Sequence, residues 1–438
     1  MMRLSHILLC VLCATLLLYA SGAALGAERF PPPQFESGHE LPLTTTPSPR
    51  SPTYELIDMA VLLGTLSLAS WLALKKRSRR GIFYLTIFSL VYFGFWRKGC
   101  VCPIGAIQNV TLALFDSGYV IPVSAIFFFA LPLVFTLFFG RTFCAAVCPL
   151  GAIQDLVLIH PLRLPDWLEH PLGLLGYVYL GAAVLFAATG SAFIICQYDP
   201  FVSFFRLSGS LEILILGVCF LLIGLFIGRP YCRFFCPYGA ILRILSWFSK
   251  WRVTTTPDEC IQCRLCENAC PFGAIQAPYT APAPSNYRTG RIKLLVLTIL
   301  FPFVIIAFGW AGTRLAPTFS RMNSRVRLAE RIHLEETGRA EDTIDESDAF
   351  RATGQPIEEL YDEAILIGKQ FTRGSMFFGV FVGLVAMLKL TALTTRRTRI
   401  NFEPDRSRCF ACGRCFDYCP QEHARRKKNG NQPSLIRT

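Results

Sequence analysis

The sequence predicts a polytopic α-helical membrane protein that carries a small, cysteine-rich α+β domain. Of its 438 residues, 53% are hydrophobic and only 17% are charged, whereas soluble proteins usually carry about a quarter charged residues. Long apolar runs alternate with short basic clusters, as in chains that cross a bilayer several times. The 18 cysteines lie mostly in tight groups, which indicates metal ligation more than a disulfide scaffold.

The N-terminus predicts export. Residues 1–27 contain one Arg, then an apolar run, then small residues, a pattern typical of a secretory signal peptide or of a retained anchor. Residues 28–55 are rich in Pro and Thr, so we expect an extended, exported segment.

Seven candidate spans follow, each near the roughly 20 residues that a bilayer needs. They are 56–74, 82–97, 121–139, 174–195, 210–228, 292–311 and 375–393. Each span carries the chain to the other side of the membrane. If residues 28–55 lie outside, then 140–173, 229–291 and the tail from residue 394 lie inside. The basic cluster Lys75–Arg80 then also lies inside, as the positive-inside rule requires, although Arg97 and Lys98 lie outside.

This topology predicts a multi-pass protein of the bacterial inner (cytoplasmic) membrane, with residues 28–55 and 312–374 in the periplasm. The lipid bilayer is therefore the first expected partner. The net charge of +13 gives no argument for nucleic acid, because much of it lies beside membrane segments, where basic residues set orientation.

The membrane domain, residues 56–253, contains an internal repeat. The stretches "GRTFCAAVCPLGAI" (140–153) and "GRPYCRFFCPYGAI" (228–241) align without gaps, 88 residues apart. Each follows a span that descends to the inner face. We therefore expect two pseudo-repeated hairpins that face one another around a shared site.

The strongest motif, C-x2-C-x2-C-x3-C-P, occurs twice. One copy lies in residues 254–291 and the other in residues 394–438, and their cysteines are Cys260, Cys263, Cys266 and Cys270, then Cys409, Cys412, Cys415 and Cys419. This is the bacterial ferredoxin spacing for a [4Fe–4S] cluster. Zinc sites more usually pair two C-x2-C knuckles.

The two runs predict one split domain. In two-cluster ferredoxins the fourth cysteine of a run ligates the other cluster, and parity places both runs inside, on either side of the hairpin 292–393. We predict a small α+β two-cluster ferredoxin-like cytoplasmic domain. Its cluster 1 is assigned to Cys260, Cys263, Cys266 and Cys419, and its cluster 2 to Cys409, Cys412, Cys415 and Cys270.

Each membrane repeat holds half of such a motif. The pairs Cys144/Cys148 and Cys232/Cys236 have the C-x3-C-P spacing, and two pairs together supply four thiolates, enough for a further cluster or another soft-metal site. The alternative is that they are buried thiols that pack as small apolar residues.

The stretch Cys-Pro-x-Gly-Ala-Ile occurs four times, beginning at Cys102, Cys148, Cys236 and Cys270. Proline suits the first turn of a helix, and Gly-Ala lets a helix pack close to a bulky site. A helix start also offers unpaired N–H groups to an anionic thiolate. We therefore expect these copies to begin helices beside metal sites.

Three further cysteines, Cys100, Cys102 and Cys196, are expected near the outer face. Three alternatives stay open: they bind a further metal, they form a disulfide, or they have neither role. The disulfide is an alternative because free thiols outside the cytoplasm tend to oxidise. In "QYDPF", Asp199 has either a quinone or proton role or, as Asp-Pro favours, a turn. The segment 242–253 suits an interfacial helix or packing on the ferredoxin runs.

Together, the two C-x3-C-P pairs, the two ferredoxin runs and the outer "GCVCPIGAIQN" resemble the NosR/NapH-type membrane polyferredoxins over about residues 80–420. The resemblance implies electron transfer between the quinone pool or the cytoplasmic side and an extracytoplasmic reductase or its flavoprotein. It implies two [4Fe–4S] clusters, and quinone as a further partner. The large exported FMN domain of NosR proteins has no counterpart among the roughly 30 residues before the first span, so we expect any flavin on an exported partner.

Two rival functions remain open. Proteins that assemble the copper site of terminal oxidases carry similar motifs, so the thiolates would hand on or reduce a metal. The other rival is a quinol dehydrogenase, although the sequence shows no clear quinone pocket. No catalytic residue is assigned.

Overall fold

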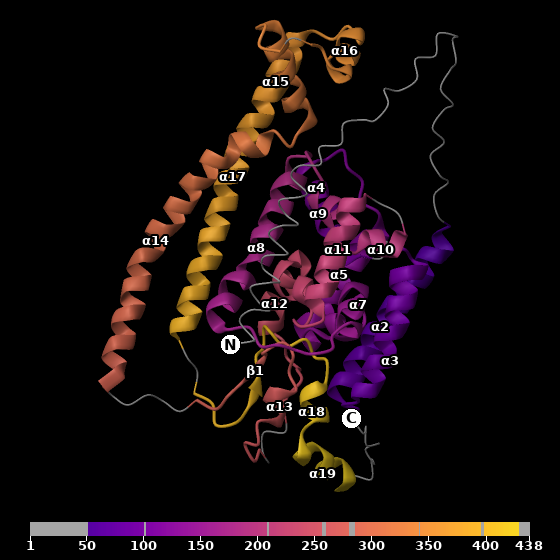
Figure 1. Ribbon diagram of the computed structural model, residues 1–438, viewed down its shortest axis with the longest axis vertical. Helices are drawn as coiled ribbons and strands as arrows, with labels where there is room; N and C mark the ends of the chain where they lie inside the picture. The colour runs from indigo at the N-terminus through magenta and orange to yellow at the C-terminus, as the bar shows by residue number, and fades with distance from the viewer. Residues whose placement is uncertain are drawn as a thin grey trace.

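In a computed structural model, the described residues are 51–99, 102–207, 210–255, 260–279, 285–340, 342–395 and 398–428. The predicted signal or anchor and most of the segment 28–55 lie outside these residues. Helices fill the middle of the molecule, the two ferredoxin runs lie together at one end, and helices α15 (Ser324–Glu336) and α16 (Asp345–Ala352) lie at the other (Figure 1).

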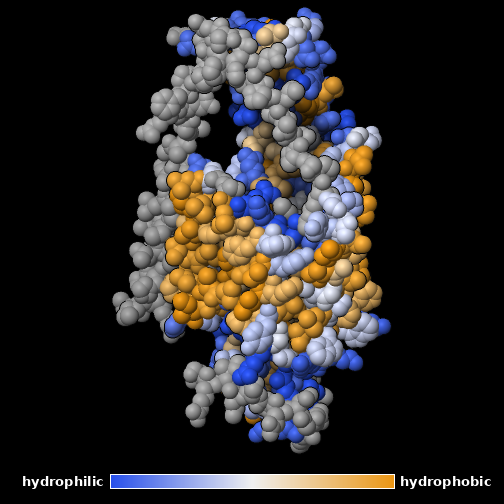
Figure 2. Space-filling view, turned by 90° about the vertical axis from the view of Figure 1, so that its right-hand side faces the viewer, coloured by the Kyte–Doolittle hydropathy of each residue, from blue (hydrophilic) through white to orange (hydrophobic). Residues whose placement is uncertain are grey.

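Apolar helices form the body of the protein. Among the described residues, four helices are long and apolar enough to cross a membrane: α2 (Pro52–Leu74), α8 (Asp166–Ala188), α14 (Ser285–Ser320, of which Gly290–Ser320 is the candidate span) and α17 (Ile357–Thr394). Shorter apolar helices are α4 (Pro103–Phe115), α5 (Val123–Phe139) and α11 (Leu211–Gly224). Hydrophobic side chains gather in a band across the middle of the molecule, between more hydrophilic ends (Figure 2). These helices mark a membrane protein.

Every predicted span coincides largely with helix, and the exact number of spans stays a prediction. The predicted second span is α3 (Arg79–Ser89), which continues as the π-helix η1 (Leu90–Trp96). The predicted span 174–195 is α8 shifted toward the N-terminus. Its first turn carries Asp166 and Glu169, which suit a helix start.

One apolar helix is not among the seven predicted spans. Helix α4 has only 13 residues, too few to cross a bilayer alone. Near the start of this helix, Arg97 forms an ion pair of 2.7 Å with the buried Asp58 of α2. If the predicted topology holds, this pairing explains why a basic residue is tolerated on the outer side, where the positive-inside rule disfavours it.

The internal repeat forms two similar units. The first consists of α6 (Thr142–Ala146) and α7 (Pro149–Leu156), and the second of η2 (Tyr231–Phe235) and α12 (Pro237–Trp247).

Three of the four Cys-Pro copies begin a helix as predicted, with Cys102, Cys148 and Cys236 at the N-cap and proline at the first helical position. The prediction is wrong for the fourth copy. After Cys270 the chain makes a turn in which Gly273 has φ +59°, because it must enter the strand β1 (Ile275–Gln276).

The two ferredoxin runs share one small sheet, although more than 120 residues separate them. Strand β1 pairs antiparallel with β2 (Glu403–Pro404), in the register Ile275 to Pro404 and Gln276 to Glu403. A further bridge joins Tyr279 to Arg399. Short helices α13 (Leu265–Asn268) and α18 (Arg414–Asp417) pack together, and α19 (Pro420–Lys428) completes the unit.

The opposite end has a separate small core. Helices α14 and α17 form a long hairpin whose far end is covered by α15 and α16 (Figure 1). The buried residues of this small core are Ala329, Ile332, Phe350 and Leu360. The remaining described helices, α9 (Ile194–Tyr198) and α10 (Val202–Arg206), are short and lie at the same end as the start of α11.

Candidate iron–sulfur sites

Both ferredoxin runs bend in the same way. In the first, Gln262 and Arg264 adopt positive φ angles of 53° and 61°, and in the second Ala411 and Gly413 adopt 55° and 80°. These are equivalent positions, two and four residues after the first cysteine of each run. Such left-handed residues turn successive backbone N–H groups toward one centre, as in many iron–sulfur and anion sites. The local backbone therefore fits a cluster in both runs.

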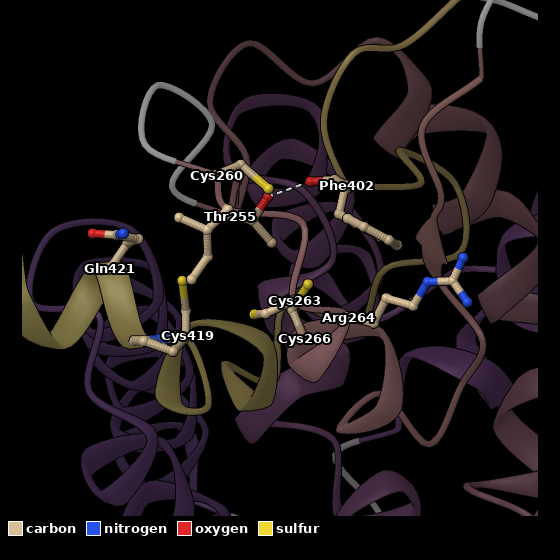
Figure 3. Close-up of a pocket in the computed structure, with 10 residues that line it drawn as sticks. Thr255, Cys260, Cys263, Arg264, Cys266, Phe402, Cys419 and Gln421 are labelled. Carbon is tan, nitrogen blue, oxygen red and sulfur yellow. Dashed lines mark hydrogen bonds between the residues drawn. The ribbon is translucent and has the colours of Figure 1, made fainter.

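The first three cysteines of the first run meet the last cysteine of the second. One pocket is lined by Cys260, Cys263, Cys266 and Cys419, and Figure 3 shows these four side chains around a common space. Beside them, the Thr255 hydroxyl donates a 2.5 Å hydrogen bond to the Phe402 carbonyl, which ties the two runs together. This is the set assigned to cluster 1, and its ligation of a cluster stays a prediction.

The set assigned to cluster 2 is also brought together. Cys409 and Cys415 each interact electrostatically with both Cys412 and Cys270, so the four thiols lie close together. The Ala274 N–H donates to the Cys270 sulfur at 3.4 Å, and the Ala411 N–H donates to the Cys409 sulfur at 3.4 Å. Hydrogen bonds of this kind stabilise thiolate ligands and tune cluster potentials.

Burial holds these thiols in their protonated form when no iron is bound. Burial first, and the charges of neighbouring thiols second, raise the pKa of Cys266 to about 11 and the pKa of Cys409 to about 12. Iron ligation requires thiolates, so cluster insertion has to displace these protons.

The half motifs of the two membrane repeats converge on a third site. Cys144, Cys148, Cys232 and Cys236 line one pocket, and three of the four are buried. These cysteines pack within the main hydrophobic core of the molecule, and their location where a span reaches the inner face stays a prediction.

Several donors point at these sulfurs. The Gly239 N–H donates to Cys236 Sγ at 3.2 Å and Gln154 Nε2 donates to Cys232 Sγ at 3.2 Å. A Cβ at Gly151 would lie 3.1 Å from Arg229 Nη1, and one at Gly239 would lie 3.3 Å from the Cys232 carbonyl oxygen. The glycines of the repeated motif thus let each helix start approach the site closely, as the sequence predicted.

Two buried arginines occupy the space between the third site and the set assigned to cluster 2. Arg141 is 1% exposed and Arg229 is 0% exposed, and they are equivalent residues of the two repeats. Arg141 donates to Cys144 Sγ at 3.7 Å and to the Ser407 carbonyl at 3.3 Å. Its guanidinium carbon also lies 4.1 Å from the ring centroid of Phe410, the residue after Cys409.

Asp155 compensates part of this positive charge. Its carboxylate pairs with Arg229 at 3.5 Å, Arg79 at 3.1 Å and Arg414 at 3.4 Å. Burial raises the pKa of Asp155, but the three arginines outweigh burial and hold that pKa at about 2. Because Arg414 belongs to the second ferredoxin run, this carboxylate also fixes that run against the membrane domain.

Sequence reasoning missed these arginines and Asp155. The signal was present in part, because "GR" stands three residues before the first cysteine of each half motif. Nothing in the pattern distinguished these two arginines from the other basic residues near the membrane surface.

The outer cysteines are only partly described. Cys102 and Cys196 lie near one another, since each carries the electrostatic influence of Asp199 and Cys102 also that of Cys196; Cys100 lies outside the described residues. Asp199 is buried and accepts a 2.9 Å hydrogen bond from the Phe201 N–H, the turn that Asp-Pro predicted.

Within the described residues, no three His, Cys, Asp or Glu side chains are grouped closely enough to hold a single metal ion. Ligands of a four-iron cluster lie farther apart, because each binds a different iron. Four thiols in each set match the number of ligands that a [4Fe–4S] cluster takes.

Comparison with known proteins agrees with this chemistry. A family model described as "4Fe-4S binding domain" matches residues 121–164 and again 210–255, the two half-motif units. A second model, also described as "4Fe-4S binding domain", matches residues 253–276, the first ferredoxin run. No solved structure matches the chain.

Three curated relatives share parts of the chain. "Putative electron transport protein YccM" of Escherichia coli strain K12 is 30% identical over 118 residues, which cover 25% of this chain and 33% of the relative. Uncharacterised protein MJ0750 of Methanocaldococcus jannaschii is 34% identical over 98 residues, which cover 22% of this chain and 41% of the relative. Protein NirI of Paracoccus denitrificans is 31% identical over 127 residues, which cover 27% of this chain and 18% of the relative. The chain thus spans less than half the length of these relatives.

Repeated 4Fe–4S binding domains on both membrane repeats and on a ferredoxin run, together with the candidate membrane helices, confirm the resemblance of this chain to the NosR/NapH-type membrane polyferredoxins.

Proposed function

We propose that this protein transfers electrons across the membrane through iron–sulfur clusters held in series. Cys260, Cys263, Cys266 and Cys419 hold one [4Fe–4S] cluster, and Cys409, Cys412, Cys415 and Cys270 hold a second. The four thiols of the membrane repeats hold a third. Bound clusters supply one-electron transfer, and the protein positions them and tunes their potentials.

The order of the sites supports this proposal. The first and second sets share the two ferredoxin runs, so they lie next to one another. The second set and the membrane site share Arg141, which contacts Phe410 on one side and Cys144 on the other. This shared contact is the observation that carries the proposal, because electron transfer requires closely spaced centres.

The two arginines suit a chain of anionic centres. A cluster with four thiolate ligands carries net negative charge, and burying it without compensation is unfavourable. Arg229 interacts electrostatically with thiols of both sites, namely Cys232 and Cys144 of the membrane site and Cys412 of the second set. Arg141 and Arg229 therefore stabilise the reduced state of both neighbouring sites.

In this proposal the ferredoxin runs face the cytoplasm of a bacterial inner membrane, and helices α15 and α16 face the periplasm. The donor is the quinone pool or a cytoplasmic reductant. The acceptor is an exported reductase or flavoprotein, reached through the region of Cys102 and Cys196. The named partners follow from the resemblance, and the arrangement of the sites supports the path between them.

A copper-assembly role is less well supported. It needs a thiolate site that hands on a single metal ion, whereas the family models that match both membrane repeats and the first ferredoxin run describe 4Fe-4S binding domains.

The proposal is tested with sealed proteoliposomes that contain ferricyanide, to which dithionite is added outside. Molecules whose ferredoxin runs face outward should carry electrons inward and bleach the ferricyanide. The Cys144→Ala/Cys232→Ala variant should lose at least about 90% of this rate, because it removes half the ligands of the membrane site.

Cys219→Ala is the matched control, since Cys219 lies in α11 outside all four-cysteine sets. It should keep the wild-type rate. Equal bleaching by the double variant and the wild type would remove the membrane site from the electron path. Bleaching that requires an added quinol instead of dithionite would favour a quinol dehydrogenase.

A further inference from the structure

A cavity of about 360 Å³ lies where the hairpin helix α17 meets the helical domain and the second ferredoxin run. Its walls come from the first turns of α8, from α12, from the last turns of α17 and from the stretch 407–410. No cysteine lines this cavity, so it is separate from the two pockets lined by four cysteines each, although Phe272 and Phe410 form part of its wall.

One part of the wall is strongly basic. Arg233, Arg243, Lys389 and Arg408 line the cavity, against a single carboxylate, Glu169. Glu169 already pairs with Arg233 at 2.8 Å and with Arg408 at 3.1 Å. The lining therefore carries a clear excess of positive charge.

The remaining basic groups have little local compensation. Arg243 donates to the carbonyl oxygens of Gly173 and Arg233, and its buried Nε has no hydrogen-bond partner. Lys389 lies within the influence of Asp405, but that carboxylate accepts hydrogen bonds from the Ser407 and Arg408 N–H groups and from Gln276. Half-buried cations without a carboxylate of their own are unfavourable, so the site suits an anion.

Another part of the wall is apolar and open to the surface. Trp247 is 61% exposed, Phe248 is 70% exposed and Leu388 is 54% exposed. Leu388 and Lys389 belong to the candidate span of α17, near the end of the helix. Trp and basic residues at the end of a span are typical of the interface between hydrocarbon and headgroups.

We propose that this cavity binds one anionic phospholipid. The phosphate lies among Lys389, Arg243 and Arg408, and an acyl chain lies along Trp247, Phe248 and Leu388. Basic pockets between membrane helices bind anionic headgroups in this way. The lipid fastens α17 to the second ferredoxin run and shields the side of the Cys409 site that Phe410 borders. This inference is independent of electron transfer.

The excess positive charge decides against an uncharged occupant. A lipid-soluble quinone also reaches such a cavity from the bilayer, but a neutral headgroup leaves the cations uncompensated. A free phosphate ion compensates them but leaves the apolar wall without a partner.

The test is native mass spectrometry of the full-length protein in a mild detergent, titrated with phosphatidylglycerol, phosphatidylcholine or inorganic phosphate. Wild type should retain one phosphatidylglycerol in preference to phosphatidylcholine. Lys389→Gln should weaken this binding about fivefold, the effect of one basic residue near a headgroup. Lys369→Gln, in the N-terminal half of the same helix and far from the cavity, should bind like wild type.

A second readout guards against misfolding. Phosphatidylglycerol should raise the Tm of wild type and of Lys369→Gln more than that of Lys389→Gln, while all three share the same Tm without lipid to within a few degrees. Equal binding of the two phospholipids, equal affinity of Lys389→Gln and wild type, a bound quinone in place of lipid, or a full Tm shift with inorganic phosphate alone would each overturn the proposal.

Discussion

At the scale of single residues, each cysteine set depends on side chains that come from distant parts of the sequence. Cys419 meets Cys260, Cys263 and Cys266 in one pocket, and Cys270 lies with the cysteines of the other run. The crossed arrangement follows from the chain direction, since each run turns away at its proline after three cysteines.

The crossed arrangement predicts crossed damage. Cys419→Ala should abolish the same EPR signal of the reduced protein as Cys263→Ala, and Cys270→Ala the same signal as Cys412→Ala. Cys263 and Cys412 mark the two clusters because each is the second cysteine of its own run. If Cys419→Ala instead reproduced the spectrum of Cys412→Ala, the ligand sets would not be crossed.

Asp155 predicts a pH-dependent contribution to stability. Its pKa is about 2 in the folded protein, compared with about 3.9 in an unfolded chain. A depressed carboxyl pKa stabilises the fold above about pH 4, and this contribution is lost as the pH falls toward 2. Asp155→Asn should therefore cost roughly 2–4 kcal/mol at pH 7, since it also leaves buried arginines uncompensated.

Thermal unfolding of both proteins between pH 7 and pH 3 checks this expectation. The Tm difference between wild type and Asp155→Asn should shrink as the pH falls below about 4. Asp348→Asn, in an exposed pair with Arg351, should change Tm little at any pH, because surface pairs contribute only about 0–1 kcal/mol. A Tm difference that stays constant across this range contradicts the assigned role of Asp155.

At the scale of elements, the hairpin of α14 and α17 depends on small residues that face one another. The buried side of α17 includes Ser375, Gly379 and Gly383. A Cβ at Gly379 would overlap the Phe308 carbonyl oxygen, and one at Gly312 would overlap that of Ser375. Small residues every four positions let membrane helices approach closely.

This contact predicts opposite effects of the same substitution at two glycines of α17. Gly379→Ala should destabilise the hairpin by about 1–3 kcal/mol, because the added methyl group forces the backbones apart. Gly368→Ala should be neutral or stabilise by roughly 0.5–1 kcal/mol, since nothing lies within 4 Å of its Cβ position and alanine favours helix. Thermal unfolding in detergent measures both. Equal Tm changes for the two variants would mean that the helices do not cross at Gly379.

The elements also show which parts of the fold were accessible from sequence. Long hydrophobic runs predicted the helices, because burial in lipid requires them. Helix ends were less accurate, as at α8, which ends at Ala188. The predicted span ran on to residue 195 because the apolar residues 192–195 resume directly after the short turn at 189–191. Helix α4 was not among the predicted spans, because its 13 residues are too few to cross a bilayer.

At the scale of the whole molecule, cysteine spacing predicted which thiols come together, since ligand geometry constrains spacing directly. It did not predict Arg141, Arg229 or Asp155, whose partners lie on other elements. The cavity beside α17 was equally inaccessible, because it depends on how α8, α12 and α17 pack.

The most direct test of the central claim, three clusters in series, is the iron content of the anaerobically purified protein, measured with its EPR spectrum during a redox titration. Wild type should hold about twelve irons per chain, four for each cluster. The Cys144→Ala/Cys232→Ala variant should hold about eight and lose one signal while keeping the two of the ferredoxin runs. About eight irons in both proteins, with identical titrations, would contradict the account.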